Sequence, residues 1–375
     1  TSADMDVTRA TAATRVDENG LVNYAEVVST DNVILNPNMD NSIPLGTAGS
    51  GWAQSGGIVE FFDGGLKLTK LSTSSRVRAK TITNSSAVLQ PDTRYQFTYD
   101  IVSNNNVASD GTILYVSGAL TSSIPNTVGS HIFNFTSGSN TNGIFQLYNN
   151  TNNSDITFDN TFVKEVTRDN VPRIDYTGGG CPHILAEPQR TNLITYSEDF
   201  TQWGVGETVV VANQLTSPSG EITADKLNAL NSINQQYISI SPTVSSGSVY
   251  TLSCFAKKGE VDYIALVGLN PFTQSFFDLN NGTVLGNTAT SSSIEDFGNG
   301  WYRCTSTFDA DTTSKFSGIY LSYDGTSISN GSSISNGEGV YIYGAQLEQG
   351  SYATSYIPTS GSTVTRNQDI FTRDG

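Results

Sequence analysis

The sequence predicts an all-β protein built from two antiparallel β-sandwich domains, with an N-terminal arm and a C-terminal extension. Three observations carry this prediction: side chains alternate with a period of two, turn signals recur at short intervals, and charged residues are scarce. Charged residues make up 14% of the 375-residue chain, against about 25% in an average globular protein. Ser, Thr, Asn and Gly must therefore supply much of the polar surface, which is typical of β-rich extracellular or structural proteins.

The alternation is clearest in residues 94–101. Every second side chain from Tyr95 to Ile101 is large and apolar, and the side chains between them are polar. This pattern predicts a strand with one face in a core and the other in water. Residues 249–255 and 301–308 alternate similarly. Hairpin-type turn signals separate such segments, at Asp63-Gly64, Asp110-Gly111, Asn281-Gly282, Asn299-Gly300, Asp324-Gly325 and Asn336-Gly337.

Two long segments follow one plan. Each has an opening segment, a Trp, a central amphipathic strand and a long closing strand. Pairing of the first and last strands closes a jelly roll, so each segment is predicted to form one. The parts lie at 35–39, Trp52, 95–97 and 155–165 in the first copy, and at 192–200, Trp203, 250–252 and 339–348 in the second.

The predicted organisation has five parts. They are an N-terminal arm (1–29), a first jelly roll (30–168), a linker (169–191), a second jelly roll (192–358) and a C-terminal extension (359–375). The tripeptide Val-Thr-Arg recurs at 7–9, 166–168 and 364–366. These tripeptides are either ends of closing strands and linkers or a chance recurrence in a Thr-rich chain.

Charge and cysteine content exclude several classes of function. The net charge of -16 argues against nucleic acid or an anionic membrane surface as a partner. No apolar run approaches the roughly 20 residues that span a bilayer, so membrane insertion is not expected. The three cysteines, Cys181, Cys254 and Cys304, form no disulfide framework or zinc motif, although a bridge between Cys254 and Cys304 stays open. The chain begins with Thr1 and stops mid-pattern at Gly375, so it is expected to be a fragment of a longer protein.

A series of motifs in the second half carries a family resemblance. In order, they are Pro172-Arg-Ile-Asp-Tyr176, Glu187-Pro-Gln-Arg-Thr-Asn-Leu193, Tyr196-Ser-Glu-Asp-Phe200, Trp203, Gly300-Trp-Tyr-Arg303, Gly344-Ala-Gln-Leu-Glu348, Thr354-Ser-Tyr-Ile-Pro358 and Val364-Thr-Arg366, within residues 171–369. Together they resemble the carbohydrate-binding-module-like, concanavalin-A-like or galactose-binding-like domains of bacteriophage tail, fibre and other virion proteins. Residues 8–21 resemble the lead-in that such proteins place directly before the Arg-Ile-Asp-Tyr segment. We therefore expect the first jelly roll to be an insertion within one base module, which an exposed loop with close ends tolerates.

The first jelly roll resembles the calcium-stabilised carbohydrate-binding modules found beside glycoside hydrolases. The similarity rests on Asn36-Pro-Asn-Met39, Trp52 and Phe158-Asp159-Asn160. In that family the opening segment and an acid on the closing strand hold a structural cation. The resemblance thus implies a structural calcium ion, with no other cofactor required. Its candidate ligands by position are Asn36, Asp40 and Asp159 in the first jelly roll, and Asn192, Glu198 and Glu348 in the second. Otherwise the asparagines cap turns and the acids are solvated or paired.

No pattern of catalytic residues emerges, so the protein is predicted not to be an enzyme. The two histidines, His131 and His183, lie in no metalloprotease motif, and the G-x-S-x-G and P-loop motifs are absent. Aromatic side chains are the expected binding groups, because sugar rings stack on Trp and Tyr. Trp52, Trp203 and Trp301 sit at core positions. The carbohydrate candidates are therefore Tyr115, Tyr148, Tyr263, Tyr320 and Tyr323.

Three functions are compatible with these features. The leading one is a phage fibre, spike or surface-decoration protein, located on the virion after assembly in the host cytoplasm. Its partners would be other virion proteins and host-surface polysaccharide, and a homo-oligomer such as a trimer is expected. The second is a purely architectural spacer within the particle. The third is the non-catalytic binding part of a polysaccharide depolymerase.

Overall fold

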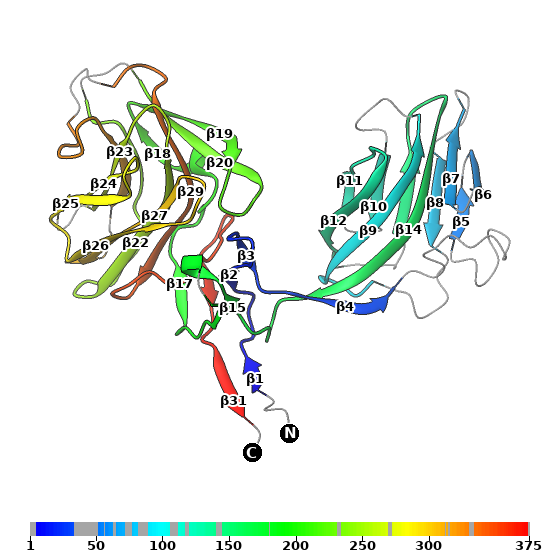
Figure 1. Cartoon of the computed structure of the whole chain (residues 1–375), viewed down its shortest axis with the longest axis horizontal. Coiled ribbons are helices and arrows are strands. Elements are labelled where there is room, and N and C mark those ends of the chain that lie inside the picture. The colour runs from blue at the N-terminus through cyan, green and yellow to red at the C-terminus, as the bar shows by residue number, and fades with distance from the viewer. Residues whose placement is uncertain are drawn as a thin grey trace. The chain divides into compact units, whose positions relative to one another are not determined.

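The chain folds into two compact units in the computed structural model (Figure 1). Unit 1 comprises residues 1–25 and 168–375, and unit 2 comprises residues 26–167. Unit 2 thus interrupts unit 1 in the sequence, as the insertion interpretation expects. The structure describes residues 5–373, apart from residues 34–51, 56, 63–64, 72–76, 82–88, 106–111, 117–119, 140–144, 180, 231–233, 269–271, 312, 314–315 and 330–333.

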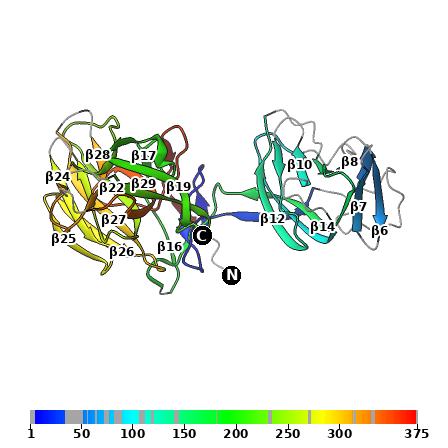
Figure 2. The ribbon, with the colours of Figure 1, turned by 90° about the horizontal axis from the view of Figure 1, so that it is seen from above.

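Unit 2 is a sandwich of two antiparallel sheets, whose layers can be followed in Figures 1 and 2. One sheet has the order β11-β10-β13-β8-β5, and the other has the order β12-β9-β14-β7-β6, with β4 paired to β14. The strands of the first sheet are β5 (Trp52–Ser55), β8 (Val77–Thr81), β10 (Thr112–Val116), β11 (Leu120–Ser123) and β13 (Phe145–Asn149). Those of the second are β4 (Val27–Asn32), β6 (Ile58–Phe62), β7 (Gly65–Lys70), β9 (Arg94–Asn104), β12 (Gly129–Thr136) and β14 (Ser154–Thr167).

The core of unit 2 lies between these sheets and is strongly aromatic. The alternating segment predicted from the sequence is β9, and its apolar side chains from Tyr95 to Ile101 are all buried. Phe97 packs against Phe145 of the opposite sheet, with ring centroids 4.9 Å apart. Trp52 is fully buried in the same cluster. Burial of this apolar surface is the main favourable contribution to the stability of the sandwich.

Unit 1 contains a second sandwich. Its sheets have the orders β18-β21-β28-β23-β24-β25 and β19-β20-β29-β22-β27-β26. The first sheet comprises β18 (Gly204–Gly206), β21 (Tyr237–Ile240), β23 (Tyr263–Gly268), β24 (Thr273–Asp278), β25 (Thr283–Asn287) and β28 (Ser317–Ser322). The second comprises β19 (Thr208–Thr216), β20 (Ile222–Ala229), β22 (Val249–Lys258), β26 (Ser291–Asp296), β27 (Trp301–Asp309) and β29 (Gly339–Gln349). The prediction of two antiparallel jelly-roll sandwiches in an all-β chain is confirmed.

Both faces of the second sheet of unit 1 are covered. Its inner face contributes to the sandwich core, where Cys254 and Cys304 lie opposite each other on β22 and β27. Both cysteines are free thiols, and burial raises the pKa of Cys254 to about 12. Its outer face packs a further cluster that includes Phe255 and Trp301. Trp301 is buried in this outer cluster and Trp203 in the sandwich core, so both are buried, as predicted.

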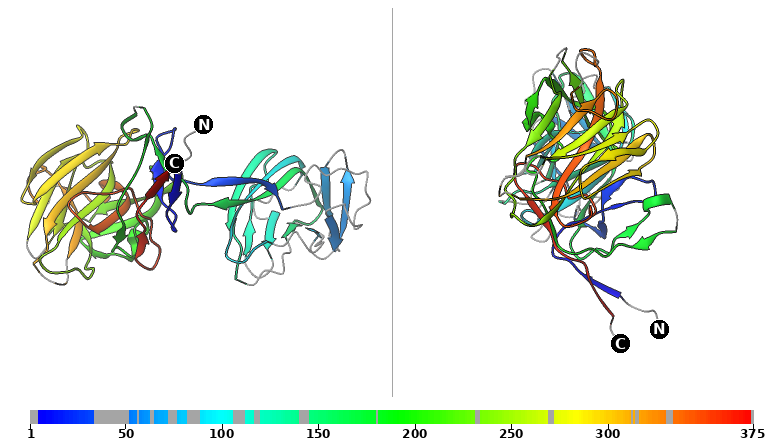
Figure 3. Two further views of the ribbon diagram at one scale, coloured as in Figure 1. Left: turned by 90° about the horizontal axis from the view of Figure 1, so that it is seen from below. Right: turned by 90° about the vertical axis from the view of Figure 1, so that its left-hand side faces the viewer.

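Short segments from three parts of the chain cover this outer face, and we call them the base. They form four two-stranded ribbons, which pair β1 with β31, β2 with β3, β15 with β16, and β17 with β30. Their bounds are β1 (Met5–Thr8), β2 (Thr14–Val16), β3 (Val22–Tyr24), β15 (Ile174–Asp175), β16 (His183–Ile184), β17 (Arg190–Asn192), β30 (Val364–Arg366) and β31 (Ile370–Arg373). Figure 3 shows β1 and β31 side by side, close to the two chain ends.

Buried ion pairs hold the base together. Asp369 binds Arg9, with Oδ1 and Nη1 2.6 Å apart, and also binds Arg173. Glu187 binds Arg173 at 2.7 Å and Arg366 at 2.9 Å. The three arginine side chains are at most 1% exposed. The predicted arm, linker and C-terminal extension are therefore revised, because charged groups join them into one body with the second jelly roll.

The two points where unit 2 leaves and rejoins unit 1 are both anchored in the base. The Ala25 amide donates to the Ala13 carbonyl. The Arg168 guanidinium lies over the Tyr24 ring, 3.9 Å from its centroid. The ends of the inserted segment are thus close together, and local contacts within unit 1 hold each of them.

The helical content of the described residues is two short 3-10 turns, η1 (Thr177–Gly179) and η2 (Phe200–Gln202). No helix in this part of the chain has the length and apolar character needed to cross a bilayer.

Candidate functional site

The candidate site is the outer face of the sheet of unit 2 that contains β10 and β13. On β10 and β13 the apolar side chains of Leu114, Phe145 and Leu147 point into the core. Because side chains alternate along a strand, Tyr115 and Tyr148 point to the opposite face. The sequence predicted both as carbohydrate contacts, and the structure brings them together.

The two tyrosines form an edge-to-face pair. Their ring centroids are 6.0 Å apart and their planes are inclined by 79°. Tyr148 is almost buried, and its hydroxyl donates to Oε1 of Gln146 at 3.1 Å. Tyr115 is half-buried. Tyr148 therefore packs against Tyr115 and holds its ring in place, and Tyr115 is the more exposed ring of the pair.

This arrangement has the chemistry of a sugar-binding face. A sugar stacks the C–H groups of one ring face on an aromatic side chain, and nearby polar groups bond its hydroxyls. Arg78 of β8 is the cross-strand partner of Tyr148, and Gln146 is the partner of Tyr115. The half-buried Arg78 supplies hydrogen-bond donors. Gln146 is buried, and because its Oε1 already accepts from Tyr148, its amide nitrogen supplies the remaining donors.

The corresponding face of unit 1 is filled by the protein itself. In each unit the long closing strand (β14 in unit 2, β29 in unit 1) belongs to one of the two sheets. The sheets opposite it therefore correspond to each other, and they contain β10 in unit 2 and β28 in unit 1. On this face Tyr320 stacks on Tyr237, with centroids 4.6 Å apart and planes 18° apart. Ile328 and Phe316 complete a buried cluster around them. Burial raises the pKa of the Tyr320 hydroxyl, and Tyr237 adds to this effect. Tyr320 is therefore a packing residue in this structure.

The structure separates the two remaining tyrosine candidates from Tyr115. Tyr263 is half-buried on β23, beneath the turn at Gly325. The φ of Gly325 is +72°, and a Cβ atom added to Gly325 would lie 3.1 Å from the Tyr263 ring. Tyr323 is 58% exposed just after β28. Neither belongs to the pair of unit 2, and Tyr323 is a suitable exposed control residue.

Asn192, a candidate calcium ligand, is fully buried and satisfied by the backbone. Its Nδ2 donates to the carbonyls of Ala345 and Ile357, at 3.1 and 2.9 Å. Its Oδ1 accepts from the amides of Ile194 and Leu347, both at 3.1 Å. Two of the four bonds join the opening segment to the closing strand, and the other two go to Ile194 within the opening segment and to Ile357 beyond the closing strand.

Glu348 and Glu198 are likewise engaged by the protein. Glu348 accepts from the Thr354 amide at 2.8 Å, from the Thr354 hydroxyl and from Gln346. Glu198 accepts from the hydroxyls of Tyr343 and Tyr356, both at 3.0 Å. Burial raises the pKa of Glu198, and these two hydrogen bonds oppose the rise. The three candidates of unit 1 serve three separate hydrogen-bond sets.

In unit 2, Asp159 lies at an irregularity of β14. Its Oδ1 accepts from the amide of Asn160, at 2.7 Å, and the φ of Asn160 is +47°. Asn36 and Asp40 lie outside the described residues. Among the residues that the structure describes, no group of three or more His, Cys, Asp or Glu side chains is arranged to hold a metal ion.

Sequence reasoning missed the polar groups that lie where the base meets the sandwich of unit 1. Arg303 and Glu187 were seen only as parts of motifs, and Asp369 was not singled out. The alternation of residues 301–308 was the available signal, because it places Arg303 on the face opposite Cys304. Single-sequence patterning assigns charged residues to water, which is why these groups were overlooked.

Comparisons with known proteins leave the family of this chain open. No protein-family model matches it, and no curated protein matches it. Similar solved structures include the CBM22-1–CBM22-2 tandem domain of Paenibacillus barcinonensis Xyn10C, at 9% identity and a TM-score of 0.27, covering 93% of this chain and 100% of that one. The Arabidopsis thaliana ANXUR1 extracellular domain has 9% identity and a TM-score of 0.24, covering 92% of this chain and 97% of that one. These values carry no argument about function.

Proposed function

We propose that this chain is a non-enzymatic, glycan-binding structural protein of a bacteriophage particle. Unit 2 would bind host-surface polysaccharide through the face that carries Tyr115. The observation that carries the proposal is the half-buried Tyr115 ring, supported edge-on by Tyr148 and flanked by Gln146. The phage assignment rests on the motif resemblance of residues 171–369.

The charge of the chain favours an uncharged or weakly charged polysaccharide. At a net charge of -16, long-range repulsion disfavours strongly anionic partners. The proposed location is the surface of the virion, where other virion proteins are the remaining partners. A homo-oligomer such as a trimer is part of the proposal, since isolated sandwiches need protection of their edge strands. Multi-angle light scattering of the full chain tests that part.

The proposed binding can be tested on immobilised bacterial surface polysaccharides. The labelled full chain should bind one or more of them saturably, and the same free polysaccharide should compete. Tyr115→Ala should weaken binding at least about tenfold, because loss of an aromatic contact at the centre of a site typically costs more than about 1.4 kcal/mol. Tyr323→Ala is the matched control and should bind as the wild type does.

A chelator arm of the same experiment tests the structural calcium ion. Loss of binding or of thermal stability in chelator, restored by calcium, would support the ion. Failure of the folded wild-type chain to bind any polysaccharide would contradict the glycan-binding function.

A specific observation favours the architectural function as the second candidate. The face of unit 1 that corresponds to the Tyr115 face is closed by Tyr320 and Ile328, so one of the two jelly rolls does not present an open aromatic face there. On the architectural function, unit 2 also binds no glycan. Deletion of residues 26–167 would then impair particle assembly and leave adsorption to host cells unchanged.

A further inference from the structure

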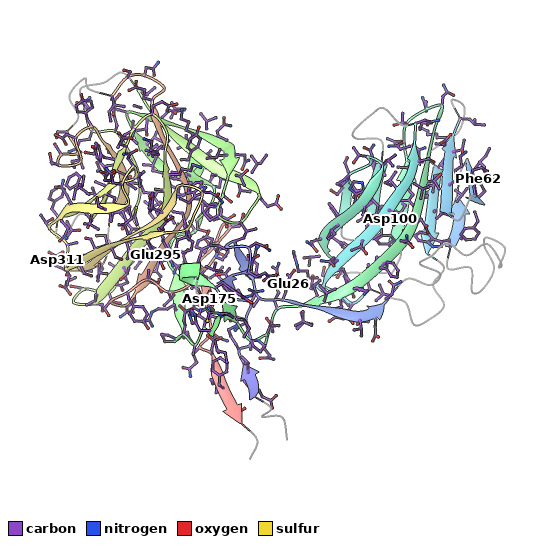
Figure 4. The ribbon with its side chains drawn as sticks, viewed as in Figure 1. Glu26, Phe62, Asp100, Asp175, Glu295 and Asp311 are labelled. Atoms are coloured by element: carbon purple, nitrogen blue, oxygen red, sulfur yellow. The ribbon has the colours of Figure 1, made fainter. Side chains whose placement is uncertain are left out.

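Unit 1 contains a cavity of about 260 Å³ between the base and its second sheet. The base contributes Asp175 and His183 to the lining, from β15 and β16. The sheet contributes Glu295 from β26 and Arg303 from β27. Figure 4 labels Asp175 and Glu295, which belong to these two sides. The cavity is distinct from the Tyr115 face, because every lining residue belongs to unit 1.

Arg303 is the unusual group in this lining. Its side chain is buried, and the residue is 8% exposed. Its Nη2 donates to the Ser253 hydroxyl at 3.1 Å, and its Nε has no hydrogen-bond partner in the described structure. Arg173 and Arg366 also have an unpartnered Nε, but each binds the Glu187 carboxylate through Nη1, whereas Arg303 binds a serine hydroxyl. A buried charged donor that binds no carboxylate is suited to an acceptor brought by a ligand.

The surrounding acids decide what kind of acceptor fits. Glu295 is the direct cross-strand partner of Arg303, yet no ion pair within 4 Å joins them in the described structure. Glu187 is already held by Arg173 and Arg366. Burial lowers the pKa of Arg303, and the negative charges of Glu348, Glu295 and Glu187 oppose this effect. These nearby acids favour a neutral hydrogen-bond acceptor over a further carboxylate as the partner of the guanidinium.

The remaining walls suit the ring of a sugar. Phe255 and Phe297 line the cavity as an edge-to-face pair with centroids 4.9 Å apart. Phe297 is half-buried, and Glu295 is exposed. Sites for drug-sized ligands span about 300–1,000 Å³, so this cavity suits a single small residue. Aromatic surface, a charged donor and a charged acceptor in one small cavity are the groups that recognise a polyhydroxylated ring.

We propose that this cavity is a second carbohydrate site, which takes one neutral sugar residue. The Arg303 guanidinium donates to one sugar hydroxyl, the Glu295 carboxylate accepts from another, and the ring packs against Phe297. Glu187 is held by its two arginines, but the carboxylates of Asp175 and Glu295 also line the cavity and disfavour a sugar that carries a carboxylate. The site does not depend on glycan binding by unit 2.

The test is a titration of the full chain with methyl glycosides, in which isothermal calorimetry or saturation-transfer NMR detects binding. The panel contains the methyl glycosides of glucose, galactose, mannose and N-acetylglucosamine, and glucuronate is the anionic comparison. At least one neutral glycoside should bind saturably, and more tightly than glucuronate. Glu295→Ala should weaken that binding about tenfold, the loss expected for one hydrogen bond to a charged group. Ser291→Ala, on the same strand and outside the cavity lining, should leave it unchanged.

Three results would overturn the proposal. They are the absence of saturable binding of any glycoside to the folded chain, equal affinity of the wild-type and Glu295→Ala chains, and tighter binding of glucuronate than of every neutral glycoside. Tyr115→Ala separates this site from the one in unit 2. If it abolishes glycoside binding, the signal belongs to unit 2 and the cavity is not a sugar site.

Discussion

Replacing Asp369 with Asn should destabilise unit 1 and leave unit 2 unaffected. The Asp369 side chain is 1% exposed and binds two arginines, Arg9 and Arg173, whose side chains are fully buried. The cluster contains three arginines and two carboxylates, so the substitution leaves Arg9, Arg173 and Arg366 with Glu187 alone. Removing one partner of a buried ion pair typically costs about 3–5 kcal/mol, because the other charge remains buried.

Thermal unfolding followed by calorimetry measures this effect. For a domain of this size each kcal/mol corresponds to about 2–4 °C, so the transition of unit 1 should fall by about 6–20 °C. Asp311→Asn is the matched control, since Asp311 is exposed on the same unit and is labelled in Figure 4. An exposed substitution of this kind changes stability by less than about 0.5 kcal/mol. If Asp369→Asn lowered the transition no more than Asp311→Asn does, the base would not depend on its ion pairs.

The ion pairs of the base, the boundary between the units and the Tyr237–Tyr320 stack each give one further prediction. Burial alone would raise the pKa values of Asp369 and Glu187, but neighbouring arginines outweigh it and lower both. The two carboxylates therefore contribute fully to stability when the pH is above their unfolded pKa values of 3.8 and 4.5, and this contribution is lost as the pH falls through the lower pKa values of the folded state. The free energy of unfolding of unit 1, measured in urea, should therefore decrease on acidification below about pH 4. A free energy that stays constant with pH would contradict this. Replacing residues 26–167 with a short Gly-Ser linker should leave the thermal transition of unit 1 within a few °C of its value in the full chain, whereas loss of a cooperative transition would show that unit 1 needs unit 2. Tyr320→Ala should destabilise unit 1 by about 3 kcal/mol in denaturant titrations, and a change below about 1 kcal/mol would show that the Tyr237–Tyr320 stack is not a packed core.

The fold followed from the sequence because period-two alternation is a local property. The segment from Tyr95 to Ile101 alternates in the sequence, and the same side chains are buried on β9. The three Trp residues were predicted to be buried because they sit where jelly rolls pack their cores, and all three are buried. Such predictions need only the geometry of a strand and the preference of apolar side chains for the interior.

The base could not be predicted in this way. Arg9 and Asp369 lie at opposite ends of the sequence, and their pairing is decided by tertiary structure. Segments that carry charged residues at low apolar density are assigned to arms and linkers by local patterning. The recurring Val-Thr-Arg tripeptide was a partial signal, because Arg9 and Arg366 end two of its copies and both are buried in the base.

The tyrosine candidates show a second limit of local patterning. Tyr115 lies on β10, along which burial alternates, and Tyr320 lies on β28, where every residue is buried, although both side chains point away from the sandwich core. Ile328 and Phe316 cover Tyr320, whereas the Tyr115 ring is half-buried beside Tyr148. The difference comes from what packs over each face, and the period of a strand carries no information about that covering.

The central claim is that unit 2 presents an aromatic ligand face and that unit 1 has closed the corresponding face. Hydrogen–deuterium exchange of the full chain, with and without the surface polysaccharides of the binding panel, tests it most directly. Added polysaccharide should slow exchange in β10 and β13, at residues 112–116 and 145–149, and leave β28, at residues 317–322, unchanged. Protection of β28 instead, or no protection by any polysaccharide, would contradict the account.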